Sequence, residues 1–158
     1  METKAEIYSR VGKEIAAVIE GESSATARYA SVACLLNLAF EDFFWTGFYI
    51  VDPLKPNELV VGPYQGTLGC LRIPFGRGVC GITAQKRETV IVDDVHAFPG
   101  HIACDSQTNS EIVVPVFNEV GELAAVLDVD STKLKNFDIM DKAGLEAICE
   151  NLLIGVKT

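Results

Sequence analysis

Apolar and polar residues follow a helical period near both ends of the chain. Residues 4–20 are predicted to form an amphipathic helix that ends at Gly21. Residues 25–41 have the composition and spacing of a second helix. Asp138 is the candidate N-terminal cap of a last helix that runs to about residue 154. Both ends of the chain are therefore predicted to be helical.

The second of these helices has an apolar stripe that predicts which side it buries. Two hydroxyl residues before it, Ser23 and Ser24, are candidate caps because a serine oxygen can accept a hydrogen bond from the first turn. The stripe is expected to consist of Ala30, Ala33, Cys34, Asn37 and Leu38.

Between the helices, the pattern changes to short runs of strand-forming residues separated by turn residues. Strands are predicted at residues 45–51, 58–64, 70–73, 90–92, 111–117 and 122–130, with a short helix from 76 to about 87. Two of the connections have the composition of hairpin turns, because residues 52–57 contain two prolines and residues 118–121 contain Asn and Gly. Helices at both ends of a mainly antiparallel sheet predict a single α+β domain over residues 1–158.

A polar segment interrupts this pattern at residues 93–110, which are rich in His, Asp, Ser and Asn. We expect a long loop there, and loops of this length in compact domains tend to be functional.

Composition and charge exclude several classes of protein. The chain has 158 residues, of which 49% are hydrophobic and 22% charged, as in a globular domain. The net charge of −9 disfavours nucleic acid as a partner, because phosphate backbones would be repelled. No apolar run approaches the roughly 20 residues of a membrane span. Residues 1–6 carry charges where a signal peptide would be apolar, so we expect a cytoplasmic protein.

Five cysteines are many for a chain of this size, and their odd number argues against a disulfide framework. Cys34 and Cys149 lie in periodic apolar segments and are predicted to be core residues. Cys70, Cys80 and Cys104 lie in one glycine-rich stretch, so functional thiols are favoured there. Thiol chemistry is expected to centre on Cys104, because its polar loop offers the exposure that a reactive thiolate needs. Cys80 follows a probable helix start, whose dipole is expected to favour its thiolate.

Three other interpretations of this stretch are open. The three cysteines could simply be small buried hydrophobic residues. A metal could be held by His96, His101, Cys104 and Asp105, but the sequence has no Cys-x-x-Cys pair and no helical His-x-x-x-His pair, so no metal is expected. Residues 76–81 match the Gly-x-Gly-x-x-Gly pattern of dinucleotide sites, but repeated βαβ units are missing, and no nucleotide cofactor is expected. These glycines are instead expected to let the backbone turn sharply into the helix.

Two groups of residues predict a pocket for a small zwitterion. Side chains alternate along a strand, so Trp45 and Tyr49 should flank the bare Gly47 and leave a slot for an apolar group. By the same rule Asp128 and Asp130 share one face, and Glu111 begins a neighbouring strand and could join them. Like charges this close raise at least one pKa, so these acids could hold a proton or bind an ammonium group. An aromatic core pair and a solvated strand end are the ordinary alternatives.

Several motifs together resemble one family over nearly the whole chain. They are Gly62-Pro-Tyr-Gln-Gly66, Gly78-Val-Cys-Gly81, Asp94-Val-His96, Gly100-His-Ile-Ala-Cys-Asp105 and Ser110-Glu-Ile-Val113. This combination resembles the free methionine-(R)-sulfoxide reductases, which are small, free-standing GAF-domain enzymes. The resemblance implies a six-stranded antiparallel sheet flanked by helices, usually in a homodimer.

The resemblance also implies a role for each candidate residue. Cys104 matches the nucleophile that attacks the sulfoxide sulfur and becomes a sulfenic acid. Cys70 matches the resolving thiol that forms a disulfide with it, and Cys80 matches an auxiliary cysteine. Trp45 and Tyr49 match the residues that contact the S-methyl end of the substrate. The carboxylates that hold the ammonium group and assist protonation are matched by Glu111, Asp128 and Asp130. Thioredoxin or a similar dithiol protein is the implied reductant.

Two other functions compete with this interpretation. The first is a GAF sensor module that binds a small ligand without chemistry. The second is a thiol protein that senses peroxide. Loss of two thiols on exposure to methionine sulfoxide distinguishes the enzyme from the sensor module. The relative rates of oxidation by peroxide and by sulfoxide distinguish the enzyme from the peroxide-sensing protein.

Overall fold

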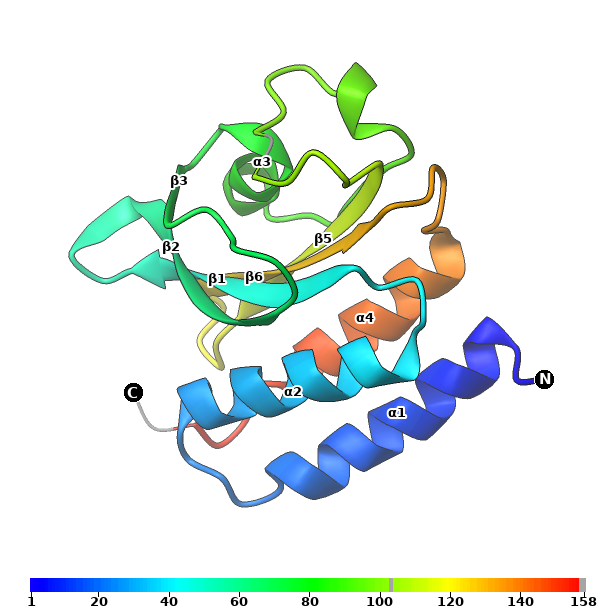
Figure 1. The fold of residues 1–158 in the computed structure, drawn as a ribbon. Coiled ribbons are helices and arrows are strands. Elements are labelled where there is room, and N and C mark those ends of the chain that lie inside the picture. The colour runs from blue at the N-terminus through cyan, green and yellow to red at the C-terminus, as the bar shows by residue number, and fades with distance from the viewer. Residues whose placement is uncertain (103, 157–158) are drawn as a thin grey trace.

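The computed structural model describes residues 1–102 and 104–156, which form helices at both ends and a sheet between them (Figure 1). In chain order the elements are α1 (Lys4–Ile19), α2 (Ala25–Ala39), β1 (Trp45–Asp52), β2 (Lys55–Gln65), β3 (Arg72–Pro74), α3 (Gly78–Lys86), β4 (Val90–Val92), the 3₁₀ turn η1 (Val95–Ala97), β5 (Ser110–Phe117), β6 (Leu123–Ser131) and α4 (Ile139–Asn151). None of the described helices is long and apolar enough to cross a bilayer.

The six strands form one sheet in the order β3-β2-β1-β6-β5-β4, and every pair of neighbours is antiparallel. Helices α1, α2 and α4 cover one face of this sheet (Figure 1). Helix α3 and the connection that contains η1 lie over the other face. The predicted α+β class with a six-stranded antiparallel sheet is confirmed.

Strand periodicity decides which residues reach each face of the sheet. Phe48, Val114 and Leu127 point to the three-helix side and are buried in one apolar cluster with α1, α2 and α4. Trp45 and Tyr49 belong to a second cluster on the α3 side. Successive side chains of a strand point to opposite faces, so one strand can supply both core and functional residues.

Capping residues fix where the helices begin. The Ser24 hydroxyl accepts a hydrogen bond from the backbone N–H of Ala27, at 3.2 Å. The Asp138 carboxylate accepts bonds from the N–H groups of Met140 and Asp141, and Asp141 completes a reciprocal capping box. Both capping assignments from the sequence are confirmed for these residues.

The predicted buried stripe of α2 is partly wrong. Ala30 is exposed, and the Leu38 side chain is 76% exposed. The buried side instead consists of Arg28, Tyr29, Val32, Ala33 and Leu36. Apolar residues occur on all sides of this helix, so the pattern alone does not determine which side contacts the sheet.

Two strand boundaries also differ from those predicted. The third strand begins at Arg72, so Cys70 lies in the loop before it. The first hairpin turn is shorter than expected, because Asp52 already pairs with Lys55. Pro56 is tolerated in β2 because β3 pairs with that strand only from Glu58 to Val60.

Candidate active site

A disulfide joins Cys70 to Cys104, which are 34 residues apart in the chain, with a Cα–Cα distance of 5.6 Å. Cys70 is half-buried in the loop before β3, and Cys104 is exposed in the connection between η1 and β5. The prediction of an exposed loop position for Cys104 is therefore confirmed. Two segments that are distant in the sequence bring their sulfur atoms together over the α3 face of the sheet.

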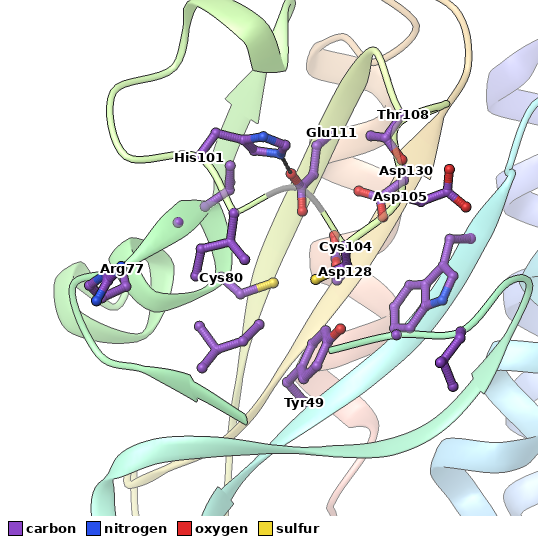
Figure 2. A pocket seen from close by; sticks show the side chains of 17 residues that line it. Tyr49, Arg77, Cys80, His101, Cys104, Asp105, Thr108, Glu111, Asp128 and Asp130 are labelled. Atoms are coloured by element: carbon purple, nitrogen blue, oxygen red, sulfur yellow. Dashed lines mark ion pairs between the residues drawn. The ribbon is translucent and has the colours of Figure 1, made fainter. Parts of the chain in front are cut away.

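A cavity lies directly beside this disulfide (Figure 2). Its lining includes all but one of the residues predicted to act on the substrate: Trp45, Tyr49, Cys80, Cys104, Glu111, Asp128 and Asp130. Cys70, the remaining one, is bonded to Cys104 at the cavity wall. The lining comes from β1, β3, β5, β6, α3 and three connecting segments, so it depends on the assembled sheet rather than on any single element.

Strand register brings the three carboxylates together. Asp130 of β6 pairs with Trp45 on one side and with Glu111 of β5 on the other. Asp128 pairs with Gly47 and Val113 two positions along. Residues in register across antiparallel strands share a face, so all three acids point to the α3 side of the sheet.

Burial makes this acidic cluster unusual. Asp128 is only 4% exposed and Glu111 only 6% exposed. The Oδ1 atoms of Asp128 and Asp130 are buried and have no hydrogen-bond partner among the described residues. Burial raises the pKa of both aspartates well above the usual range, and the neighbouring carboxylates raise it further. At least one of these groups is accordingly expected to hold a proton near neutral pH.

Cys80 is on the first turn of α3, as the sequence indicates, but its environment differs from the one expected. Its side chain is 4% exposed. Burial is the largest cause that raises the pKa of this thiol well above its usual value, and Asp128 and Glu111 raise it further. The expectation that the helix dipole favours a Cys80 thiolate is therefore wrong, because burial and nearby carboxylates outweigh the dipole.

The aromatic wall is also more crowded than predicted. The Trp45 ring stacks on Tyr49, with centroids 5.6 Å apart, and on Tyr64, with centroids 4.9 Å apart. Tyr64 pairs with Gly47 across the strands, and a side chain at position 47 would collide with it. The predicted slot over Gly47 is therefore filled by Tyr64, while Trp45 and Tyr49 still line the cavity.

The structure adds cavity residues whose role the sequence did not reveal. Arg77 precedes α3 and His101 lies in the long connection, and both line the cavity. His101 Nε2 lies 3.7 Å from Glu111 Oε1. His101 was considered only as a metal ligand in the sequence, because nothing in the local pattern indicates a carboxylate partner on β5.

A polar contact ties together the two loops that carry the disulfide. Thr67 Oγ1 donates a hydrogen bond of 2.6 Å to Asp105 Oδ2. The Thr67 carbonyl oxygen accepts a second bond, of 2.8 Å, from Trp45 Nε1. Thr67, close in sequence to Cys70, therefore links the loop of Cys104 to Trp45 of β1.

The glycines before and within the first turn of α3 allow a backbone conformation that other residues rarely adopt. Gly76 and Gly78 have φ angles of +84° and +65°, in the left-handed region that glycine adopts readily. A Cβ atom at Gly81 would collide with the Pro74 carbonyl oxygen. The six described strands are antiparallel at every pairing, so they form none of the βαβ units of a dinucleotide fold. This agrees with the sequence-based preference for a turn into the helix.

The remaining two cysteines lie outside the cavity. Cys149 is buried in the three-helix core, as predicted. Cys34 is only partly buried on α2, so the prediction of a core position holds for it only in part.

Comparison with known proteins identifies the fold and its relatives. The GAF-domain family model matches residues 36–156. The free methionine-R-sulfoxide reductase of Escherichia coli K12 is 40% identical over 149 residues, which cover 94% of this chain and 88% of that protein. The reductase of the same name from Saccharomyces cerevisiae is 46% identical over 109 residues, covering 69% of this chain and 61% of that protein.

A solved structure is also similar over almost the whole chain. It is the X-ray structure of the free methionine-R-sulfoxide reductase from Neisseria meningitidis in complex with its substrate. The identity is 46% and the TM-score 0.91, with 96% of this chain and 89% of that chain covered.

The family match and the site together first define a class: the chain is a GAF-domain protein with a pair of cysteines beside a cavity. The chain belongs to the GAF-domain family and, within it, to the group of the free methionine-R-sulfoxide reductases. It is accordingly an oxidoreductase, and the resemblance found in the sequence is confirmed.

Proposed function

We propose that the chain reduces free L-methionine-(R)-sulfoxide to methionine, with Cys104 as nucleophile and Cys70 as resolving thiol. One observation carries the proposal: the Cys70–Cys104 disulfide lies at the wall of a cavity that also contains buried carboxylates. Such a site combines a two-electron reductant with proton donors, and reduction of a sulfoxide needs both. The relatives named free methionine-R-sulfoxide reductase supply the substrate class.

The first step is attack by the Cys104 thiolate on the sulfoxide sulfur. A bond forms between the two sulfur atoms as the electron pair of the sulfur–oxygen bond moves to oxygen, which takes up a proton. The hydroxyl group then bonds to the Cys104 sulfur while the sulfur–sulfur bond breaks and its electron pair goes to the methionine sulfur, which leaves methionine and a Cys104 sulfenic acid. The position of Cys104 suits this role, because it is exposed in a loop at the mouth of the cavity. A thiolate there remains accessible to a small molecule.

The developing oxygen anion needs a proton, and Asp128 is the proposed donor. Its pKa is raised by burial and by Asp130 and Glu111, so it retains a proton at a pH where ordinary carboxyl groups have lost theirs. Its buried and unpartnered Oδ1 atom can reach a ligand without first breaking a hydrogen bond to the protein.

Cys70 completes the half-reaction. Its thiol attacks the Cys104 sulfenic acid, which forms the disulfide and releases water. A dithiol protein such as thioredoxin then reduces the disulfide by exchange, and both thiols are regenerated. Exposure of Cys104 in the disulfide form supports this step, because an external thiolate must reach one of the two sulfur atoms.

The same cavity explains why a free amino acid would be the substrate. The three carboxylates favour an ammonium group, and Trp45 and Tyr49 provide an apolar wall for the S-methyl end. Methionine within a peptide has an uncharged amide in place of the ammonium group, so it would leave these acids uncompensated.

We propose further that the substrate enters only the reduced enzyme. In the disulfide form the centre of a water molecule can reach about 40 Å³ of the cavity, a narrow space that suits a few water molecules. Reduction frees the Cys104 loop from Cys70, so the loop can withdraw and enlarge the cavity.

The proposal also includes the role of Cys80, the location of the protein, its domain and oligomeric state, and its cellular role. Cys80 lies beside the acids as an auxiliary thiol that does not form the disulfide. A cytoplasmic location supplies the reducing conditions that thioredoxin-type recycling requires. Residues 1–158 form one domain and two copies form a homodimer, which light scattering of the purified protein can test. Repair of methionine after oxidative stress is the corresponding cellular role.

Product analysis with separated R and S sulfoxides tests the proposal directly. In the presence of thioredoxin we expect continuous formation of methionine from the R form only. Cys104→Ser should abolish turnover, whereas Cys70→Ser should give roughly one turnover per site. Cys34→Ser is the matched control and should retain full activity. Steady turnover by Cys104→Ser would show that the nucleophile is another residue.

A further inference from the structure

Cys80, Glu111 and Asp128 form a cluster that the proposed reduction uses only in part. The Cys80 sulfur, one carboxylate oxygen of Glu111 and one of Asp128 all lie within 4.8 Å of one another. All three residues are buried. This set differs from the four residues considered as a metal site in the sequence and shares none of them. It is assembled from α3, β5 and β6, which the sequence could not place side by side.

A second observation indicates that this cluster can take a ligand. Asp128 is 4% exposed, and its Oδ1 atom has no hydrogen-bond partner among the described residues, although it lines the cavity. Among the described lining residues, positive charge comes only from Arg77 and, when protonated, His101. Figure 2 shows Arg77 at the opposite side of the cavity from the acids. His101 Nε2 lies 3.7 Å from Glu111 Oε1, but no cationic side chain among the described residues pairs with Asp128, so a cation at the cluster would compensate the charge of Asp128 once that group ionises.

We propose that Cys80, Glu111 and Asp128 bind a divalent cation of the zinc class. Zinc-like ions accept one thiolate together with carboxylate oxygens, whereas Mg²⁺ and Ca²⁺ require oxygen ligands throughout. The ligand bond lengths of zinc imply ligand atoms about 3.4–3.6 Å apart in a tetrahedral site. The three atoms lie within 4.8 Å of one another, so binding would draw them closer together, and a water molecule would occupy the fourth position.

The site is available in the disulfide form of the protein. Cys80 is a free thiol in the structure, while Cys70 and Cys104 are bonded to each other. The binding reaction needs no oxidant or reductant. The cation displaces the Cys80 thiol proton and the proton held by the buried carboxyl groups, both protons go to solvent, and metal–sulfur and metal–oxygen bonds form. The space of about 40 Å³ that the centre of a water molecule can reach suits an ion with a bound water molecule. The inference therefore goes beyond the proposed reductase function and does not depend on it.

Cobalt titration of the disulfide form tests the proposal without measuring turnover. Co²⁺ is a spectroscopic substitute for Zn²⁺, and a cobalt–thiolate bond gives a near-ultraviolet charge-transfer band. We expect this band to saturate at one Co²⁺ ion per chain. Added Zn²⁺ should remove the band, and excess Mg²⁺ should leave it unchanged. The band should be lost in Cys80→Ser, and it should remain in Cys34→Ser and in Cys149→Ser, the matched buried thiol.

Glu111→Gln provides a variant that keeps every thiol. We expect its cobalt affinity to fall at least about 10-fold, because a carboxylate ligand is replaced by a neutral amide, while circular dichroism shows an unchanged fold. Absence of the band in the wild-type chain, or its persistence in Cys80→Ser, would overturn the proposal. An unchanged affinity in Glu111→Gln would do the same, and none of these results would affect the reductase assignment.

Discussion

Asp128 shows how a single residue links stability to the proposed chemistry. It lies on the face of β6 that carries the cavity, between Gly47 of β1 and Val113 of β5. Its buried oxygen has no hydrogen-bond partner within residues 1–102 and 104–156, which is unfavourable for folding because burial removes the water that would solvate it. The same isolation raises the pKa of the carboxyl group and makes it a proton donor.

Replacing this acid by an amide should therefore stabilise the protein. The pKa of Asp128 is higher in the folded than in the unfolded protein, so the folded state favours the protonated carboxyl group. The stability that this protonated form contributes is complete below the ordinary carboxyl pKa. It is lost as the pH rises through the raised pKa of the folded state. Asp128→Asn stays neutral, so its advantage over wild type should grow with pH, to about 1–3 kcal/mol in the free energy of unfolding. Urea denaturation at several pH values measures this.

The exposed Asp93 provides the control, since Asp93→Asn removes one carboxylate outside the cavity and shows the effect of the change in net charge alone. A variant Asp128→Asn that loses stability relative to wild type as pH rises would contradict the assignment of a raised pKa.

At the scale of single residues, the sequence correctly predicted which face of a strand a side chain occupies, but it did not predict which other side chains that residue contacts. Alternation along β1 correctly placed Trp45 and Tyr49 on one face, and alternation along β6 did the same for Asp128 and Asp130. It could not show that Tyr64 covers Gly47, because that contact depends on the register between β1 and β2. For the same reason the burial of Cys80 against the carboxylates of two other elements was missed.

Among the elements, the loop that carries Cys70 depends on one glycine. A Cβ atom at Gly69 would lie 2.9 Å from Trp45 Cζ2 and 3.1 Å from Tyr49 Oη. These rings are held in a stack with Tyr64 and cannot move freely. The bare backbone at Gly69 therefore allows Cys70 to pass close over the aromatic wall and reach Cys104.

Gly69→Ala should slow disulfide formation without preventing the first chemical step. The added methyl group displaces the loop, so the Cys104 sulfenic acid should persist longer before Cys70 reaches it. We expect at least about a 10-fold slower loss of the second thiol, which corresponds to about 1.4 kcal/mol in the barrier. Trapping of the sulfenic acid with dimedone, followed by mass spectrometry, measures its lifetime.

Gly12→Ala is the matched control, because a Cβ atom there meets nothing within 4 Å. Equal sulfenic acid lifetimes in both variants would show that Gly69 does not set the position of Cys70.

Element types were more predictable than element boundaries. The caps Ser24 and Asp138 and the alternating pattern of the strands located the helices and the sheet. The start of β3 was misplaced, because this three-residue strand owes its position to pairing with β2 rather than to its own sequence. Local patterns describe local preferences, and short strands depend on their partners.

For the whole molecule, the disulfide acts as a cross-link between two loops on the same face of the sheet. It closes a separation of 34 residues, which limits the freedom of the unfolded chain. The three-helix face contains the larger apolar cluster and is unaffected by this bond. Redox state is therefore expected to change global stability while leaving the fold intact.

Reduction should lower the free energy of unfolding by about 2–4 kcal/mol, the typical contribution of a disulfide. Calorimetry of the oxidised and reduced protein measures this difference. The Cys70→Ser variant should melt at one temperature under both conditions. Identical melting of the oxidised and reduced wild-type protein would contradict a cross-link of this kind in solution.

Thiol mapping after a single exposure to substrate tests the central claim most directly. Fully reduced protein, which has five cysteines, is mixed with excess methionine-R-sulfoxide without any reductant, and its thiols are alkylated and located by mass spectrometry. We predict the loss of two thiols per chain and the formation of one methionine. The two should be Cys70 and Cys104, joined as a disulfide, with Cys34, Cys80 and Cys149 alkylated. Five unchanged thiols, or a disulfide that includes Cys80 instead, would contradict the account.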